Sequence, residues 1–593
     1  LAIGGTLLVA PASIVQPGVI LTVTGRGGAG GTGLIGGNGG GGFGGEANMG
    51  SSANFRAGNQ VGRFESGRQQ ISVDGEGGSG AVGGEGRAGG IDLRSLEGAS
   101  QINGRIGWSA TAIGGDSSDG IGGLGAGGGF AVRGNVTVAG NILMDAGTRG
   151  GNGSDGGGDA FGGNITLTGD LTAQGGLEGF ITAIGGNATA SGTGGRGAGG
   201  RFELLTSNAE AAFVAGFVEI FADTTGGSGA TGGDATGATV RLLTVQPGAS
   251  IDLGALDVRG NATGGNGDVA GLGQGGSILL ANTGIMRFSQ LNGGVALEAV
   301  GIGGFGGSGQ GGAGRGGTIS VQNDAGGSFS IVTGDGLGMQ ADGRGGDTFD
   351  GRGGAGVGGN ATFSNAGNSS IGGDLSLSAE GDSGGGLTAD DGLGGVASVI
   401  QSGGSTIVRG DLSAEARGDG RAGNVTGGTA RVSVTAGTLD IQIGGLRLEA
   451  DGFGRSSTGG TVTLFSGSQL LVAGDIGLQA RSFGGQQNTQ ADMRGGSIAI
   501  DVLAGSRLQA GGRFDADVTA DTDQITAGQA RAGSITLTSA GVVSIGGAAS
   551  FLAQVAHDGI AQQPGLSLGG NIVVTLTGGT MTTSPKPPMG RSI

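Results

Sequence analysis

The stretch GGTVTLFSGSQLLVAGDIGLQARSFGG, residues 459–485, contains the pattern that decides the fold. Three apolar segments follow one another in it, TVTL at 461–464, SQLLV at 468–472 and IGLQA at 476–480. In each segment apolar residues alternate with others, Val, Ile, Leu and Thr are common, and Gly or Asp stands at the borders. This period of two predicts three short strands with one buried face, and no segment has the 3.6-residue period of a helix.

The opening motif of this stretch, two small residues followed by x–apolar–x–apolar, recurs along the whole chain. Clear copies include GGNITL from Gly162, GGTISV from Gly316 and GGSIAI from Gly495. The second small residue falls at positions 5, 45, 89, 128, 163, 200, 238, 276, 317, 359, 395, 428, 460, 496, 533 and 570. The intervals run from 32 to 44 residues and average about 37.7. A repeat of this length indicates a solenoid, and its variable length indicates that part of each repeat is a tolerant loop.

A glycine-rich segment follows the third apolar stretch in nearly every repeat, and residues 25–45 form the longest one. The chain has 157 Gly among 593 residues, a composition typical of disorder when no period is present. Here the period, together with 36% hydrophobic residues, argues for order. Two arrangements stay open for these segments, which could stack as polyproline-II-like layers or extend the sheets.

Together these patterns predict an all-β fold, a parallel β-helix. A triplet of strands cannot bury its apolar side alone, whereas stacked triplets enclose a continuous core. We expect about 15–16 coils of ~37 residues, right-handed by crossover chirality, with three short strands and a Gly-rich loop in each. At about 4.8 Å per coil the rod would be about 75 Å long. We expect one continuous solenoid over 1–578 and a Pro-containing tail or linker over 579–593.

Composition excludes several classes of protein. The chain has no Cys, which removes disulfide frameworks and thiolate metal sites. The net charge is −17 and the cations, nearly all Arg, are scattered singly, unlike the basic stripe of a nucleic-acid-binding protein. No apolar run reaches the length of a membrane span. We therefore expect no nucleic-acid partner and no membrane-spanning segment.

Four acidic segments resemble fragments of calcium loops, namely 114–120, 151–160, 346–354 and 388–395. Their Asp residues lack the nine-residue spacing of calcium-binding β-helix repeats. We therefore favour a solvated acidic surface, keep structural calcium as an alternative, and predict no cofactor or metal-ligand set.

A second acidic feature lies at the outward position of the third strand. In successive repeats this position holds Glu298, Gln340, Ser378, Glu415, Glu449, Gln479, Asp517 and Gln554. Stacking would bring them into one column, in which only Glu415 and Glu449 are charged neighbours. The column could bind bridging cations, but a surface that keeps the rod soluble is the favoured interpretation.

Isolated residues provide little support for catalysis. G-x-G-x-x-G recurs only because Gly is so abundant, and Lys586, which lies in SPKPP, makes no P-loop. His557 could belong to a Ser-His-Asp arrangement, yet a single His near one end of a rod is usually incidental. Trp108 occupies a third strand, where we expect its ring to fill or cap the core. One Trp and no Tyr argue against a carbohydrate cleft lined by aromatic rings.

The repeats resemble the large β-strand-repeat exoproteins of Gram-negative bacteria, such as filamentous-haemagglutinin-like adhesins and autotransporter passengers. The resemblance implies export through outer-membrane secretion machinery and a role at the cell surface in adhesion, biofilm matrix or fibre formation. Host or abiotic surfaces, or a polysaccharide, would be partners. The absence of Cys suits a chain that crosses an outer membrane unfolded.

Three functions compete. A non-enzymatic structural or adhesive rod is favoured because every repeat looks like the others, so no catalytic residue is assigned. A β-helix polysaccharide lyase or glycosidase would need a local cluster of carboxylates or bases. An ice-binding solenoid would need a regular Thr array, and TVT and TIS recur without sharing a column. Because the repeat begins at Gly4 with no cap before it, we expect the rod to continue into more chain or to associate end to end.

Overall fold

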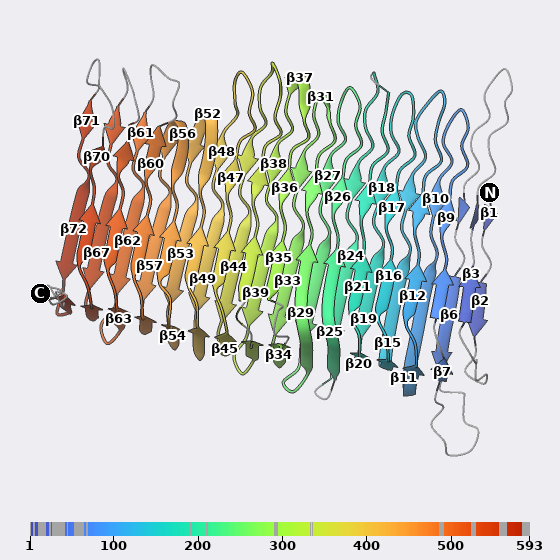
Figure 1. Cartoon of the computed structure of the whole chain (residues 1–593), viewed down its shortest axis with the longest axis horizontal. Helices are drawn as coiled ribbons and strands as arrows, with labels where there is room; N and C mark the ends of the chain where they lie inside the picture. Colours follow the sequence, from blue (N-terminus) through green and yellow to red (C-terminus); the bar gives the residue numbers. More distant parts are fainter. Residues whose placement is uncertain are drawn as a thin grey trace, which may run out of the picture.

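The computed structural model describes residues 70–583 apart from 190, 209–210, 290–293, 333, 335, 485–491, 523–528 and 557–565. Strands before residue 70, and residues 94–100 and 421–422, are described by their backbone alone. The described residues are all-β and contain no helix, so none that could span a bilayer. The chain folds as a parallel β-solenoid, as the sequence predicts (Figure 1).

The first strands of the coils lie where the small–small–x–apolar–x–apolar motif predicts them, and each pairs in parallel with the next. They are β2 (Thr6–Val9), β6 (Glu46–Ser51), β11 (Gly90–Ile102), β15 (Gly129–Val138), β19 (Asn164–Thr168), β24 (Arg201–Thr206), β28 (Thr239–Thr244), β33 (Ser277–Asn282), β39 (Thr318–Asn323), β44 (Asn360–Asn365), β49 (Val396–Gln401), β53 (Thr429–Val434), β57 (Thr461–Ser466), β62 (Ser497–Val502), β67 (Ser534–Ser539) and β72 (Asn571–Leu576).

Second strands follow after a tight corner. They are β7 (Phe64–Ser66), β20 (Leu171–Ala173), β34 (Ile285–Phe288), β40 (Ser328–Ile331), β45 (Asn368–Ile371), β50 (Ser405–Val408), β54 (Thr438–Ile441), β58 (Gln469–Val472), β63 (Arg507–Ala510), β68 (Val542–Ile545) and β73 (Thr580–Thr583). In two coils β11 and β15 run on through this position, and in two others β25 (Ala212–Phe221) and β29 (Ser250–Arg259) join the second strand to the third.

The third strands are β3 (Val19–Thr22), β8 (Gln69–Ser72), β12 (Ile106–Ser109), β16 (Ile142–Asp145), β21 (Leu177–Phe180), β35 (Val295–Glu298), β41 (Leu337–Gln340), β46 (Leu375–Ser378), β51 (Leu412–Glu415), β55 (Leu446–Glu449), β59 (Ile476–Gln479), β64 (Phe514–Asp517) and β69 (Ala549–Leu552). First, second and third strands of the described coils belong to one 42-stranded sheet, which we call the body.

The body encloses one hydrophobic core that runs from Ile71 to Ile545. Strand residues alternate between buried and more exposed, as in β57, where Val462 and Leu464 are buried and Thr463 faces outward. In β62, likewise, Ile498 is 1% exposed and Ala499 points away from the core. The predicted inward and outward positions are therefore confirmed in these two strands, and burial of the inward set supplies the main stabilising free energy.

A buried polar ladder runs along the corner between the first and second strands. Thr244, Asn282, Asn323, Asn365 and Gln401, each the last residue of its first strand, are no more than 1% exposed. Their side chains bond from coil to coil at 2.7 Å for the first three links and 3.1 Å for the fourth. Because buried amides must be hydrogen-bonded, this ladder fixes the register of the coils that it joins.

The glycine-rich segments leave the body after the third strand and return to the next first strand, which makes a thin plate that we call the fin (Figure 1). Its short strands form a 29-stranded sheet in the described chain. The outgoing arms carry β4 (Gly25–Arg26), β9 (Gly75–Glu76), β13 (Ala112–Ile113), β17 (Thr148–Arg149), β22 (Ala183–Ile184), β26 (Thr224–Thr225), β30 (Ala262–Thr263), β36 (Gly301–Ile302), β42 (Gly343–Arg344), β47 (Gly381–Asp382), β60 (Ser482–Gly484), β65 (Ala520–Asp521) and β70 (Val555–Ala556).

The returning arms carry β1 (Ala2–Ile3), β5 (Gly42–Phe43), β10 (Gly86–Arg87), β14 (Gly125–Ala126), β18 (Ala160–Phe161), β23 (Gly197–Ala198), β27 (Ala235–Thr236), β32 (Gly273–Gln274), β38 (Gly314–Arg315), β43 (Gly356–Val357), β48 (Gly392–Leu393), β61 (Met493–Arg494), β66 (Ala530–Arg531) and β71 (Ser567–Leu568). Strands β52 (Gly418–Thr426) and β56 (Gly452–Thr458) span both arms, and the tips of two coils add β31 (Gly267–Val269) and β37 (Gly306–Gln310).

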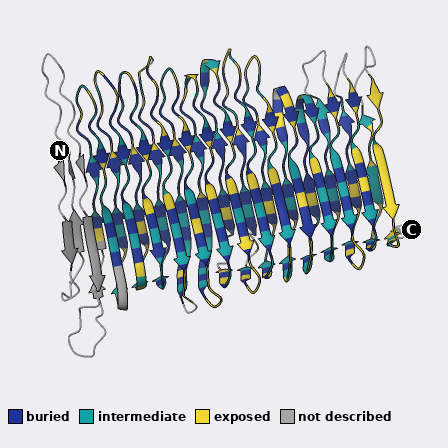
Figure 2. Cartoon of the chain, turned by 180° about the vertical axis from the view of Figure 1, so that it is seen from behind, coloured by how far each residue is buried: buried dark blue, intermediate teal, exposed yellow. Residues whose placement is uncertain are grey.

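The two arms of the fin touch through their backbones, so these segments are not free loops. The amide of Gly115 donates to the carbonyl of Gly84 at 2.8 Å, Gly123 donates to Gly115 at 2.7 Å, and Gly151 donates to Gly123 at 2.8 Å. This zigzag between outgoing and returning arms continues to Gly384. A Cβ on Gly123 would stand 1.9 Å from the carbonyl oxygen of Gly84. Glycine is therefore required by close backbone approach. In most of the described short strands one residue is buried and its neighbour is more exposed (Figure 2).

The short strands form a parallel sheet of their own, separate from the sheet of the body, and the two arms pack against each other through their backbones. The tolerance of these segments to changes in length stays a prediction. Of residues 25–45, only strands β4 and β5 lie inside the described part of the chain.

Candidate binding face on the third strands

The outward residues of the third strands form one surface along the rod, which we call the third-strand face. Two columns of side chains make it up, because a four-residue strand presents alternate residues outward. The inner column holds Gln70, Gly107, Leu143, Glu178, Glu219, Asp257, Ala296, Gly338, Ser376, Ser413, Arg447, Gly477, Asp515 and Ser550. The outer column, two residues later, lies on the side of the fin.

The outer column contains the acidic and polar residues that the sequence predicts to stack. Glu298, Gln340, Ser378, Glu415, Glu449, Gln479 and Asp517 are in register one after another. Gln554 does not belong to this column, because Leu552 is the partner of Asp517. Gln554 lies two residues further along, where its carbonyl accepts from the amide of Ala520. A slip of two residues keeps the same face outward, so alternation alone could not reveal it.

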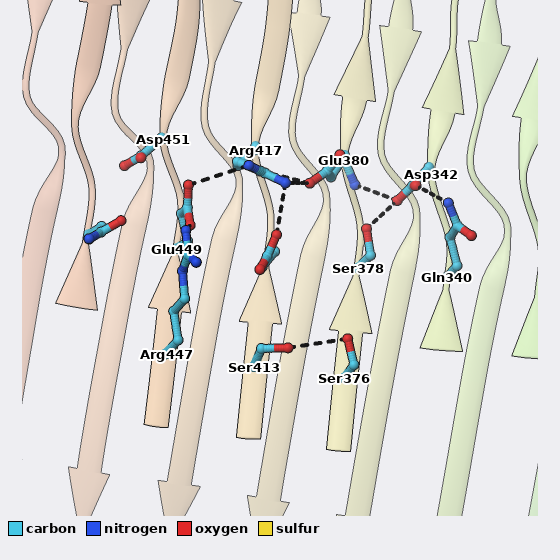
Figure 3. Close-up of polar contacts among 12 residues, drawn as sticks. Gln340, Asp342, Ser376, Ser378, Glu380, Ser413, Arg417, Arg447, Glu449 and Asp451 are labelled. Atoms are coloured by element: carbon cyan, nitrogen blue, oxygen red, sulfur yellow. Dashed lines mark hydrogen bonds and ion pairs between the residues drawn. The ribbon is translucent and has the colours of Figure 1, made fainter. Parts of the chain in front are cut away.

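Arginines neutralise the like-charged neighbours Glu415 and Glu449 (Figure 3). Arg417, two residues beyond Glu415, forms ion pairs with Glu415 at 2.9 Å, with Glu449 at 3.7 Å and with Glu380 in the preceding coil. Arg447 contacts Glu449 from the same strand. Guanidinium groups thus neutralise these carboxylates, and Arg417 links acids of adjacent coils.

Asp451 and Arg481 continue this network. Arg481 donates from its backbone amide to Asp451 Oδ1 at 2.6 Å and from Nε and Nη2 to Oδ2 at 3.0 and 2.7 Å. Burial raises the pKa of Asp451 to about 6, against the opposing effect of the bonds from Arg481. Burial likewise raises the pKa of Glu380, which Arg417 opposes. The Asp451 side chain is fully buried and both of its oxygens are bonded to Arg481. Asp451 therefore links two neighbouring coils from inside the structure.

Three hollows lie along the third-strand face, each where the inner column carries small residues. The first, of about 520 Å³, surrounds Gly107 beside Trp108, and the second, of about 410 Å³, extends over Ala296 and Gly338. The third, of about 670 Å³, includes Ser376, Ser413 and Gly477. Larger side chains, among them Leu143, Glu178 and Arg447, stand within or between the hollows. The hollows therefore form an interrupted groove parallel to the rod axis.

The largest hollow has a mixed polar lining. Along one wall Asp374, Asp411 and Asp475 each accept a backbone amide of the next coil through Oδ1, at 2.6–2.8 Å. Their Oδ2 atoms are the oxygens left for a ligand. The Ser413 hydroxyl bonds to that of Ser376 at 3.2 Å (Figure 3). Glu415, Arg447, Gln479 and Arg481 also line the hollow, so it holds both hydrogen-bond donors and acceptors.

Two stacked phenylalanine pairs border the same side of the rod. Phe180 and Phe221, in the outer column, stack with centroids 4.9 Å apart, and Arg259 lies 5.6 Å from the centre of the Phe221 ring. Phe453 and Phe483 stack at 4.6 Å on the outgoing arms, with Arg481 at 4.8 Å from the Phe483 ring. All four rings are half-buried. Trp and Tyr are the aromatic platforms expected from the sequence, and Phe is not among them. Aligning the repeats places Phe180 beside Phe221 and reveals the first pair.

The acidic segments of the fin bond to the next coil. Asp116 accepts the amide of Asn152 at 2.7 Å, Asp347 that of Gly385 at 2.6 Å, and Asp159 that of Arg196 at 2.8 Å. Asp390 pairs with Arg352. Among the described residues no group of three or more His, Asp or Glu gathers in a geometry for a metal ion. Structural calcium therefore stays the alternative to the favoured solvated acidic surface.

The other residues singled out from the sequence have varied positions. Trp108 is 1% exposed in β12, with its ring 6.0 Å from that of Phe130, which confirms the predicted core position. His557 and Lys586 lie outside the described residues. Thr318 and Thr461 do share an outward column of the first strands, contrary to expectation, but Asn360 and Val396 interrupt it. The regular Thr array of an ice-binding surface is thus not formed there.

No known protein-family model, curated protein or solved structure matches this chain significantly. The structure itself establishes a glycine-rich parallel β-solenoid whose third strands carry a polar, grooved face.

Proposed function

We propose that this chain is a non-enzymatic rod that displays its surface outside a Gram-negative bacterium, as an adhesin, a matrix component or part of a fibre. Outer-membrane secretion machinery would export it. The family resemblance of the repeats supports this placement, and the absence of Cys is compatible with passage in an unfolded state.

The observation behind the proposal is that polar side chains join neighbouring coils. Buried Asn282 and Asn323, the Asp residues of the fin and the network around Arg417 all connect one coil to the next. Neighbouring coils are thereby joined in the core and fin, and in parts of the rod also at the corner and the face, a one-dimensional design suited to a stiff spacer.

Surface labelling of the native organism tests the location, and incubation with polysaccharides tests the chemistry. We expect antibodies against the rod to label intact cells, and electron microscopy of the purified chain to show straight rods. Release of shorter glycans or of unsaturated ends by the purified chain would overturn the proposal.

A β-helix polysaccharide-degrading enzyme is the second candidate, supported by the carboxylates around the largest hollow. Asp411 and Glu415 line it, next to Arg447. In that case Asp411→Asn and Glu415→Gln would abolish glycan cleavage while leaving the circular dichroism spectrum unchanged.

A further inference from the structure

We propose that the third-strand face binds a neutral, linear polysaccharide whose chain lies along the rod axis. This inference deepens the proposed adhesive function and rests on it, since it names the chemical class to which the rod would adhere.

The shape of the face favours an extended polymer. The three hollows lie on one column of outward residues, and the largest spans residues of four successive third strands. Parallel strands repeat about every 4.8 Å along the axis, so equivalent side chains recur at a spacing comparable to the length of a sugar unit. A compact ligand would fill one hollow, whereas a linear polymer can contact several.

The polar groups of the groove match hydroxyl groups, which both donate and accept. Carboxylate oxygens of Asp374, Asp411 and Asp475 accept, while Arg447 donates and the serine hydroxyls do both. The backbone bonds through Oδ1 hold these carboxylates in place before a ligand arrives, which lowers the entropic cost of binding.

Phe180, Phe221, Phe453 and Phe483 provide flat apolar surfaces on the same side of the rod. Each pair is stacked within 5 Å, and an arginine contacts one ring of each pair, so the rings are rigidly held. Each ring already stacks on its pair partner, and an arginine lies over Phe221 and over Phe483. A pyranose can therefore contact the edges of the rings and the faces that remain, while its hydroxyls reach the neighbouring polar groups.

Charge favours a neutral polymer over a polyanion. Glu178, Glu219 and Asp257 follow one another in the inner column, and the wall of the largest hollow adds three further carboxylates. A uronate polymer or nucleic acid would be repelled where these carboxylates gather, because Arg447 is the only cation among the described residues of the inner column, although Arg481 also lines the largest hollow.

The test is isothermal titration calorimetry of the full chain with cellohexaose, mannohexaose and maltohexaose, and with an alginate hexamer as the polyanion. We expect at least one neutral hexasaccharide to bind and alginate to bind at least tenfold more weakly. The blocking variant is Gly338→Trp combined with Gly477→Trp. A Cβ on Gly477 meets no atom within 4 Å, and one on Gly338 meets only the carbonyl oxygen of Val295, at 4.0 Å, so both sites can accept a side chain.

Blocking should weaken binding at least tenfold, whereas the matched variant Thr463→Trp, on the outward side of a first strand, should bind like the wild type. Equal circular dichroism spectra and melting temperatures verify folding. The proposal is overturned if none of the neutral glycans binds, if alginate binds more tightly, or if both variants behave alike. Absence of binding would leave the rod function intact, whereas cleavage of a bound glycan would contradict the rod function and not the binding face.

Discussion

In the body, Val462 and Leu464 of one coil stack in register on Ile498 and Ile500 of the next, and all four side chains are buried. In the fin, Gly115, Gly123 and Gly151 meet through backbone amides and carbonyls, with no space for a side chain. The body thus gains stability from removing apolar area from water, and the fin from hydrogen bonds in a glycine layer. The difference shows that glycine, often a mark of flexibility, is here a packing element.

The fin itself changes along the chain. The glycine zigzag extends from Gly78 to Gly384, and further along the fin side chains lie between the arms. Met493, Ala520 and Ala530 form a small apolar cluster there, and the Ser457 hydroxyl bonds with that of Ser482 at 2.5 Å. The two arms of the fin therefore pack together in two ways, through backbone contacts in one part and through small side chains in the other.

The largest effect is expected in the body. Replacing Ile498 by Asp would place an unpaired charge in the core and reduce the free energy of unfolding by about 3–5 kcal/mol. Ala499→Asp, one residue on and facing outward, should change it by less than about 1 kcal/mol. Limited proteolysis and chemical denaturation would measure both. Equal damage from the two variants would contradict the observed alternation.

An intermediate effect is expected in the fin. Gly123→Ala would force the carbonyl of Gly84 away and cost about 1–3 kcal/mol, although only one methyl group is added. Gly477→Ala is the matched control, because its Cβ meets open space and a small gain of about 0.5 kcal/mol follows from the stiffer unfolded chain. Hydrogen exchange of fin amides should rise for the first variant alone. Unchanged exchange in Gly123→Ala would show that the arms can separate without cost.

An effect that depends on pH is expected where body and fin meet, at Asp451. Because its pKa is raised from 3.8 to about 6, its contribution to stability is fully present below about pH 4 and is lost as the pH rises through 6. The wild type should therefore lose unfolding free energy relative to Asp451→Asn as the pH rises from about 4 to about 6.5. Denaturation at several pH values measures it. A slope of opposite sign would mean that attraction by Arg481 outweighs the cost of burial.

Much of the fold is predictable from the sequence because strands leave a period of two and coils a period of about 37 residues. The outward column from Glu298 to Asp517 followed from these two periods and is confirmed. Gln554 was misplaced because a shift by two residues leaves the alternation unchanged. The groove was not foreseen, since the hollows depend on which small residues, such as Gly338 and Ser376, become neighbours across coils.

The sequence alone determined the strands, the repeat and the inward residues, because burial of one face imposes a pattern that the chain itself carries. Only the tertiary structure decided how the glycine arms meet and which acids Arg417 reaches. Glycine has no side chain whose chemistry could indicate which residue it contacts. Whether a long side chain reaches a neighbouring coil depends on distances in three dimensions. The backbone contacts of Gly115 and Gly123, and the bridge from Glu380 to Glu449, exist only once the coils are stacked.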